Sequence, residues 1–424
     1  MTERLLQFIW QFQYFNKQAL STYDGAPLQV LHPGQLNTNQ GPDFSQGKIK
    51  IDTTIWAGNI ELHVKASDWH IHKHAADKNY NNIILHVVWQ NDAAVQDENG
   101  NHIPTLELQP YVPAIMMQKY TQLMEHKGFV PCEGHLPVLS GIAWFAWKER
   151  LAIERLMRKS KEVLVLLAES NDHWEEVFWW MLAKNFGIPV NADVFQKVAK
   201  SVSINILAKH KNQLHQLEAL LLGQAGLLND EFTDDYPLML QKEYRFLAKK
   251  YSLQQVHKAP SFLRMRPANF PTVRLAQLAM LIHQSSHLFS RIKDTKTITD
   301  IQNMFVVTAN DYWHYHYTFT EPTPYSPKSL GKQMANNIII NTIIPVLFAY
   351  GASHNEQQFK DIPIKWLLQL PPENNTITNK WKEKEVLNQN ALDSQALIEL
   401  KNNYCNKRLC LDCAVGNKLL PIKN

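Results

Sequence analysis

The hydrophobic pattern of this chain changes its period near residue 112, and this change restricts the fold more than any other feature. Before that position, short apolar stretches predict strands, and beyond it apolar residues recur at helical spacing. Because side chains repeat about every two residues on a strand and about every 3.6 on a helix, the two patterns cannot share one element. We therefore predict an α+β protein with an α/β domain at residues 1–111 and a mostly helical domain at residues 112–424.

The first domain is predicted to contain a helix at 3–17 and a His- and Lys-rich loop or short helix near 68–80. The turn sequence Asp97-Glu98-Asn99-Gly100 predicts a hairpin between its last two strands. The predicted strands lie at 28–31, 46–53, 55–65, 82–90 and 103–108. The predicted helices of the second domain lie at 112–126, 140–169, 172–186, 191–209, 211–227, 234–252, 271–291, 329–350, 355–369 and 390–404.

Composition indicates a soluble, cytoplasmic protein. The chain has 424 residues, of which 45% are hydrophobic, so it can build more than one core. Its N-terminus lacks the pattern of a secretory signal, and four cysteines fit a reducing compartment. The apolar run Ile338–Ala349 is interrupted by Asn341 and Pro345 and is too short to span a bilayer, so no membrane partner is expected. The net charge of +4 permits binding to nucleic acid without requiring it.

The segment from Asp43 to Lys65 carries the candidate chemistry. Glu61, His63 and Lys65 share one face of the strand predicted at 55–65, and Asp43 follows a Gly-Pro turn upstream. Two carboxylates that converge in a sheet can hold a hard cation such as Mg²⁺ or Mn²⁺. A Lys or His beside that ion can orient or deprotonate a water. The alternative is an ordinary meander with a solvated polar face.

This order of residues resembles the PD-(D/E)xK nuclease superfamily. Pro42 and Asp43 match its first motif and Glu61 matches its second acid, whereas His63 stands where the superfamily has Lys, and Lys65 follows two positions later. The resemblance implies a restriction-endonuclease-like core with the order αβββαβ. It also implies that Asp43 and Glu61 bind Mg²⁺ or Mn²⁺, that Lys65 or His63 activates water, and that the substrate is DNA or RNA.

A second set of segments is spread over nearly the whole chain: Asn39–Phe44, Trp56–His63, Ser67–Trp69, Tyr80–Asn82, Leu85–Val88 and Arg266–Pro271. With these segments the chain resembles an uncharacterised bacterial family, domain of unknown function 2851, for which no activity is implied. This resemblance extends to the cysteine-rich tail.

Four histidines, His63, His70, His72 and His74, lie within twelve residues and form a second candidate metal site. Zinc enzymes need three such ligands and one open position, so a zinc hydrolase is an alternative function. The spacing matches no established zinc motif, and a polar surface loop is the competing interpretation. His86, inside an apolar strand, is expected to be a core or wall residue.

The arginines Arg264, Arg266 and Arg274 surround a predicted helix start at Pro271. Helix N-termini favour anions, and the Arg guanidinium binds phosphate with two hydrogen bonds. Phe270 could stack on a base. This segment is therefore a candidate nucleic-acid site, and a clamp of Arg side chains on carboxylates is the alternative.

The C-terminal segment contains Cys405, Cys410 and Cys413 within nine residues. Close thiols in a reducing compartment favour a metal over a disulfide, and Cys132, or His135 in its place, could complete the site. Zinc and an iron–sulfur cluster both fit this spacing. Some nucleases of the PD-(D/E)xK superfamily also hold a four-cysteine cluster, with different spacing. Three free thiols near the C-terminus are the competing interpretation.

The function predicted from these patterns is a metal-dependent nuclease whose helical domain positions nucleic acid. A non-catalytic nucleic-acid or protein-binding module on the same fold is the first alternative, and the zinc hydrolase is the second. The distance between the Asp43 and Glu61 carboxylates in the structure is the observation that best separates these three functions.

Overall fold

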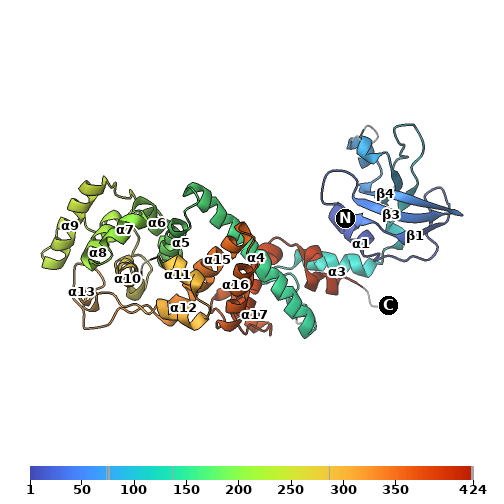
Figure 1. Cartoon of the computed structure of the whole chain (residues 1–424). Helices are drawn as coiled ribbons and strands as arrows, with labels where there is room; N and C mark the ends of the chain where they lie inside the picture. The colour runs from blue at the N-terminus through green and yellow to red at the C-terminus, as the bar shows by residue number, and fades with distance from the viewer. Residues whose placement is uncertain (73, 75–76, 137, 286, 422–424) are drawn as a thin grey trace. The chain divides into compact units, whose positions relative to one another are not determined.

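The computed structural model describes residues 1–421, apart from 73, 75–76, 137 and 286 (Figure 1). The chain forms two compact units, one of Met1–Trp144 with Leu400–Asn424 and one of Phe145–Glu399. The first holds a mixed sheet and the second is helical, so the α+β class is confirmed. The predicted division after residue 111 coincides with the end of the sheet, whereas the division by contacts falls at Trp144.

The sheet of the first unit has the strand order β1-β3-β4-β5-β6, with β2 paired to β3. The strands β1, β3 and β4 form an antiparallel meander, and β4, β5 and β6 run parallel to one another. The strands are β1 (Leu28–His32), β2 (Gln35–Leu36), β3 (Phe44–Ile51), β4 (Thr54–Lys65), β5 (Ile83–Gln90) and β6 (Thr105–Glu107).

The predicted hairpin between the last two strands is wrong, because β5 and β6 are parallel. The turn at Asp97–Gly100 exists, with the Gly100 N–H donating to the Asp97 carbonyl at 3.1 Å. It closes only an isolated antiparallel bridge between Gln96 and His102. The fourteen-residue connection 91–104 is long enough to carry the chain back and start β6 beside β5 in the same direction.

Helix α1 (Glu3–Gln11) packs its apolar residues against the sheet and contacts β4. Thr2 caps it by accepting the Leu5 N–H at 3.2 Å, and Leu6 and Trp10 are buried. The helix is shorter than the predicted 3–17, because the backbone turns at Gln13, where φ is 53°. Its polar residue Gln7 faces the sheet and reaches Asp43.

The rest of the first unit consists of short helices. Between β4 and β6 lie α2 (Asp68–Ile71) and η2 (Lys78–Tyr80), and after β6 come η3 (Gln109–Tyr111), α3 (Ala114–Glu125) and η4 (Glu133–His135). The C-terminal segment adds η7 (Leu400–Cys405), η8 (Cys410–Asp412) and α19 (Ala414–Leu419). Arg408 attaches this segment to α3 by donating to the carbonyls of Leu123 at 2.9 Å and His126 at 2.6 Å.

The second unit follows the predicted helical runs, with two of them divided. The run at 191–209 becomes α6 and α7, and the run at 271–291 becomes α10 and α11. The helices are α4 (Gly141–Glu169), α5 (Trp174–Phe186), α6 (Ile188–Ser201), α7 (Ile204–His210), α8 (Leu214–Gln224), α9 (Asp235–Tyr251), η5 (Pro267–Asn269), α10 (Pro271–Gln284), α11 (Leu288–Asp294), α12 (Ile298–Met304), α13 (Asp311–His314), α14 (Lys332–Ile338), η6 (Ile339–Ile343, a π-helix), α15 (Ile344–Ser353), α16 (Gln358–Gln369), α17 (Thr376–Glu383) and α18 (Ala391–Glu399).

The continuous helix Lys332–Ser353, formed by α14, η6 and α15, is the one described segment long and apolar enough to span a bilayer. Most of its most apolar stretch is buried inside the second unit, as in the core helix of a soluble protein.

Candidate metal centre

Asp43 and Glu61 lie together on neighbouring strands of the meander. Asp43 immediately precedes β3, and Glu61 stands in the middle of β4. The Asp43 N–H donates to Glu61 Oε2 at 2.9 Å, and the Leu62 N–H donates to Asp43 Oδ2 at 3.1 Å. Gln7 of α1 donates to Asp43 Oδ1 at 2.8 Å. Each carboxylate is therefore held by the backbone beside the other one.

The two carboxylates occupy an environment that disfavours their charges. The Glu61 side chain is buried, and burial followed by the charge of Asp43 raises its pKa to about 9. Burial and the charge of Glu3 raise the pKa of Asp43 to about 7, although the Leu62 N–H, Gln7 and Arg4 act in the opposite direction. A cation placed between these groups would offset both effects.

Three imidazoles complete a cluster around Glu61. The ligand nitrogens of His63, His72 and His74 all lie within 4.8 Å of one another. Glu61 Oε1 lies 3.7 Å from His63 Nε2 and 3.5 Å from His74 Nε2. His63 comes from β4, whereas His72 and His74 come from the loop after α2. The fold thus brings Glu61 of the first predicted metal site to the histidines of the second, while the Asp43 carboxylate lies beside Glu61 on Gln7 and the Leu62 N–H.

The surroundings of His63 and His74 favour the neutral imidazole, which is the form that binds metals. Burial, and after it the neighbouring His74 and His72, lower the pKa of His63 to about 3. Burial and His72 lower the pKa of His74 to about 4. His74 Nε2 is buried and has no hydrogen-bond partner among the described residues. This nitrogen faces Glu61 and is available to a ligand.

His86 holds His63 in place. In the parallel pairing of β4 with β5, His86 is the register partner of Glu61, and its Nε2 lies 2.8 Å from His63 Nδ1. This contact leaves His63 Nε2 directed at the cluster. Trp69 packs edge-on against His63, and Tyr80 stacks on His74 with ring centroids 3.9 Å apart. The expectation that His86 is a wall residue agrees with this position.

Other residues of the predicted site lie away from the cluster. Lys65 is exposed at the end of β4, where its charge acts on Asp92 and lowers the pKa of that carboxyl group behind the larger effect of Ser67. His70 is exposed and lies 3.2 Å from the Ala94 carbonyl through Nε2. The structure therefore brings His63, and not Lys65, to Asp43 and Glu61.

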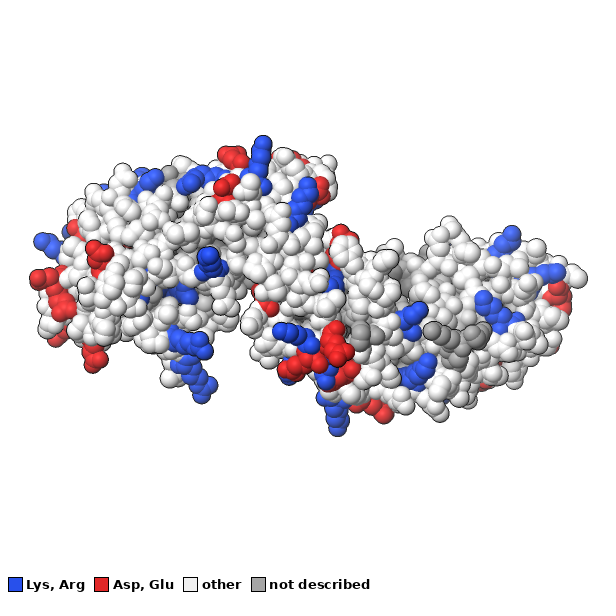
Figure 2. All heavy atoms as spheres, turned by 90° about the horizontal axis from the view of Figure 1, so that it is seen from below, with Lys and Arg blue, Asp and Glu red and all other residues white. Residues whose placement is uncertain are grey.

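The predicted nucleic-acid residues of the helical unit fall into two environments. Arg264 and Arg266 are exposed, and Phe270 is half-buried against Phe262. Arg274 is instead buried inside α10. On the face drawn in Figure 2, the described Lys and Arg stand in separate groups with Asp and Glu among them, so no continuous basic band crosses that face.

The four cysteines, which are all free thiols, surround one small cavity in the first unit. Cys405 and Cys410 come from the C-terminal segment with Cys413, and Cys132 comes from the loop after α3. Burial, followed by the charges of the other thiols, raises the pKa of Cys132 to about 12 and that of Cys410 to about 11. His135, the predicted substitute, is exposed. The tertiary structure thus gathers thiols that are far apart in sequence.

Comparison with known protein families shows the family to which the chain belongs. The family described as Protein of unknown function (DUF2851) matches residues 3–376. The chain belongs to this family. The match includes Asp43, Glu61 and the histidine cluster, but it ends before Cys405, so it does not reach the cysteine-rich tail as the sequence resemblance suggested. No curated protein and no solved structure matches the chain.

Two contributors to this site were missed by sequence reasoning. Gln7, which holds Asp43, is one of several polar residues on α1 and has no distinguishing pattern. The contact between His86 and His63 depends on the register of β4 against β5, which are separated by seventeen residues. The only signal for it was a histidine inside an otherwise apolar strand.

Proposed function

We propose that this member of the DUF2851 family is a divalent-metal-dependent nuclease that hydrolyses phosphodiester bonds at the cluster of Asp43, Glu61, His63, His72 and His74. One observation carries the proposal: buried Glu61, whose pKa is raised, faces His63 and His74 and lies beside half-buried Asp43, and no Lys or Arg of the described residues forms an ion pair with either acid. Buried charges are normally paired or bound to metal. The donor set fits Mn²⁺ or Zn²⁺ better than Mg²⁺, because imidazole nitrogens suit these metals.

The residues of the cluster would have different roles in hydrolysis. When bound, a divalent ion supplies a Lewis acid for the scissile phosphate and lowers the pKa of a water. Asp43, Glu61, His63 and His74 would hold the ion, while Gln7 and His86 orient Asp43 and His63. His72 is the exposed member of the cluster and lies at its solvent side. Lys65 remains the alternative group for activating water.

The choice of a phosphodiester substrate is supported by the order of the elements. Helix α1, the meander of β1, β3 and β4, the short α2 and then β5 follow one another as in the PD-(D/E)xK core. Helix α2 spans only Asp68–Ile71, so the second core helix is reduced to about one turn. The exposed Arg264 and Arg266 provide cations for phosphates on the helical unit.

The test is cleavage of single- and double-stranded DNA and RNA in Mg²⁺, Mn²⁺ and Zn²⁺. Glu61→Gln and Asp43→Asn should abolish cleavage, whereas Asp52→Asn, a matched change in the exposed β3–β4 turn, should leave it intact. His63→Ala should also abolish cleavage, whereas cleavage lost in Lys65→Ala with metal binding intact would assign water activation to Lys65. Cleavage that survives Asp43→Asn and Glu61→Gln would refute the proposal.

The second candidate function is a zinc hydrolase of another substrate class, favoured by the close approach of His63, His72 and His74. Zinc-dependent hydrolysis of model esters or peptides without nuclease activity would support it. Metal binding with no hydrolysis of any substrate would support the non-catalytic binding module.

We also propose a metal at the four cysteines, supported by their convergence on one cavity from two chain segments. Four thiolates satisfy either zinc or an iron–sulfur cluster. Protein purified anaerobically should contain zinc, or iron with a visible absorption band, and Cys132→Ser and Cys410→Ser should remove it. Metal-free protein in which all four thiols react with a thiol reagent would exclude this site.

A further inference from the structure

A cavity of about 660 Å³ lies within the helical unit. Its walls come from α4, α5, α6, α10, α14 and η6. Its polar lining consists mainly of cations and amides, among them Lys159, Arg274, Asn185, Asn269 and Asn341, and it includes one acid, Glu162. The volume lies within the range of small-molecule sites, about 300–1,000 Å³.

Arg274 is the unusual member of this lining. Arg274 is only 8% exposed. Its guanidinium donates to two neutral amides, to Gln277 Oε1 at 3.0 Å and to Asn269 Oδ1 at 2.5 Å. Its Nε is buried and has no hydrogen-bond partner among the described residues. Burial lowers its pKa to about 10. Buried arginines are nearly always paired with an acid, so this one lacks an anion.

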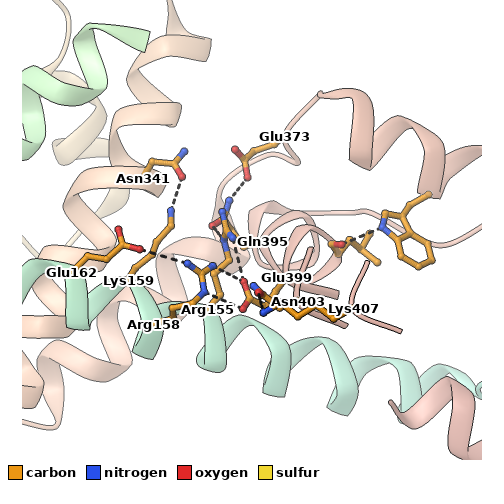
Figure 3. Close-up of polar contacts among 12 residues, drawn as sticks. Arg155, Arg158, Lys159, Glu162, Asn341, Glu373, Gln395, Glu399, Asn403 and Lys407 are labelled. Carbon is orange, nitrogen blue, oxygen red and sulfur yellow. Dashed lines mark hydrogen bonds and ion pairs between the residues drawn. The ribbon is translucent and has the colours of Figure 1, made fainter. Parts of the chain in front are cut away.

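Lys159 is a second cation without a carboxylate. It donates to Asn341 Oδ1 at 2.7 Å, as Figure 3 shows, while Arg155 and Arg158 turn to Glu399 at 3.2 and 2.7 Å. Arg158 also lies 3.6 Å from Glu162. Burial and the charge of Arg155 lower the pKa of Lys159 to about 7. Glu373 and Glu162 act on the charge of Lys159 in the opposite direction, but Glu373 accepts from Gln395, Glu162 pairs with Arg158, and neither is seen in an ion pair with Lys159 among the described residues.

Two further parts of the walls are the start of α6 and the π-helical turn η6. Ile188 and Pro189 line the cavity at the start of α6, where Pro189 has no N–H to donate to an anion. The π-helical turn η6 places Asn341 and Thr342 on the opposite side of the lining. π-Turns of this kind occur often at functional sites.

We propose that this cavity binds the phosphate of a nucleotide-sized ligand. Arg274 offers the planar fork that matches phosphate oxygens, and Lys159 offers a point charge. Asn269 accepts from Arg274 through Oδ1, and its NH2 group is the donor that can reach a ligand beside this guanidinium. Asn185 and Asn341 donate to Thr342 and to the Asn337 carbonyl, and binding would exchange these bonds for bonds to the ligand. The same phosphate could belong to free phosphate, to a nucleotide or to the end of a nucleic acid. Phosphate binding in this cavity does not require hydrolysis at Glu61.

Binding to the full-length protein tests this site. Calorimetric titrations in EDTA would use inorganic phosphate, a nucleoside monophosphate and a short 5′-phosphorylated single-stranded DNA. Arg274→Gln and Lys159→Gln should each weaken the binding of the preferred ligand about tenfold or more, as the loss of a charge-assisted hydrogen bond predicts. Lys197→Gln, which removes an exposed cation from α6, should leave binding unchanged.

Comparing the affinities of the three ligands identifies the source of the phosphate. The ligand that binds most tightly is the one whose atoms beyond the phosphate also fit the cavity. If Arg274→Gln does not fold, Asn341→Ala replaces it, because Asn341 holds Lys159. Absence of saturable binding of all three ligands to wild-type protein would overturn the proposal. Equal affinity in wild type, Arg274→Gln and Lys159→Gln would also overturn it. Asp43→Asn and Glu61→Gln should bind like wild type, so failure of the nuclease proposal is distinguishable.

Discussion

Glu61 is the residue whose surroundings most favour a bound metal ion. It is 5% exposed, and within the part of the chain that the structure describes its one hydrogen-bond donor is the Asp43 N–H at 2.9 Å. An ionised carboxylate in such surroundings is unfavourable without a positive partner. In metal-free protein the side chain therefore retains a proton, with a pKa near 9.

The first prediction concerns the pH dependence of metal-free protein. Between the ordinary pKa of 4.5 and the raised value of about 9, folded Glu61 holds a proton that the unfolded chain has released. Its contribution to stability is therefore complete below about pH 4.5 and is lost as pH rises toward 9. Relative to Glu61→Gln, the unfolding free energy of wild type should fall by up to about 1.4 kcal/mol per pH unit.

Hydrogen exchange of the β3 and β4 amides in EDTA at pH 6, 7.5 and 9 measures this difference for the first unit alone. Asp52→Asn serves as the control, since Asp52 is exposed. Added Mn²⁺ should restore stability at high pH in wild type only. Parallel pH curves for wild type and Glu61→Gln would contradict the assignment of a raised pKa.

The second prediction concerns His86, which supports the site from inside the sheet. His86→Leu removes the contact to His63 Nδ1 without leaving a large void. Metal affinity should fall about 10- to 100-fold, the usual effect of losing a group that orients a ligand. His70→Gln, a change at an exposed histidine, should have no effect. Calorimetric titration with Mn²⁺ and Zn²⁺ measures the affinities. Equal affinities in wild type and His86→Leu would show that His86 does not orient His63 for metal binding.

Among the elements, three helices of the second unit meet at a buried acid. Glu218 of α8 accepts from Tyr236 of α9 at 2.7 Å and from Trp313 of α13 at 3.0 Å. Burial raises the pKa of Glu218 to about 7. These contacts tie a single-turn helix, α13, to two long ones.

The third prediction tests this connection. Trp313→Phe keeps most of the buried ring but removes one donor to Glu218, so unfolding of the second unit should become easier by about 1–3 kcal/mol. Tyr325→Phe, at an exposed tyrosine, should change stability by much less. Chemical denaturation of both variants provides the measurement, and equal midpoints would show that the hydrogen bond to Trp313 contributes little.

At the scale of the whole molecule, the chain completes its first unit with its last residues. Leu400–Asn424 belongs with Met1–Trp144, and the second unit is formed by the residues between them. Arg4 pairs with Asp412 at 2.5 Å, and Arg408 closes on two carbonyls at the end of α3. Removing the tail should therefore affect the first unit and spare the second.

The fourth prediction is a truncation after Glu399. Amides of α3 and of the Cys132 loop should exchange faster, because their contacts with Arg408 and the tail cysteines are lost. Amides of α8 and α10 should keep their protection. Exchange measured by mass spectrometry separates the two regions, and unchanged protection of α3 would show that the tail does not stabilise the first unit.

The sequence by itself determined the element types, because periodicity is a local property. The alternation at 55–65 predicted β4, and helical spacing predicted α4 at 140–169 within a residue of its observed ends. Local pattern also identified Asp43, Glu61 and the histidines as polar groups in an unusual arrangement. It missed α12, α13 and α17, whose short runs carry too few turns for a period to show.

Tertiary structure alone decided which of these residues meet. The parallel pairing of β4 with β5 sets His86 behind His63, and the loop after α2 returns His74 to within 3.5 Å of Glu61. Register and loop return depend on non-local packing, which leaves no period in the sequence. For the same reason the sequence showed Arg274 only as one of three arginines around a helix start, and the fold shows it buried beside a cavity without an acid among its described partners.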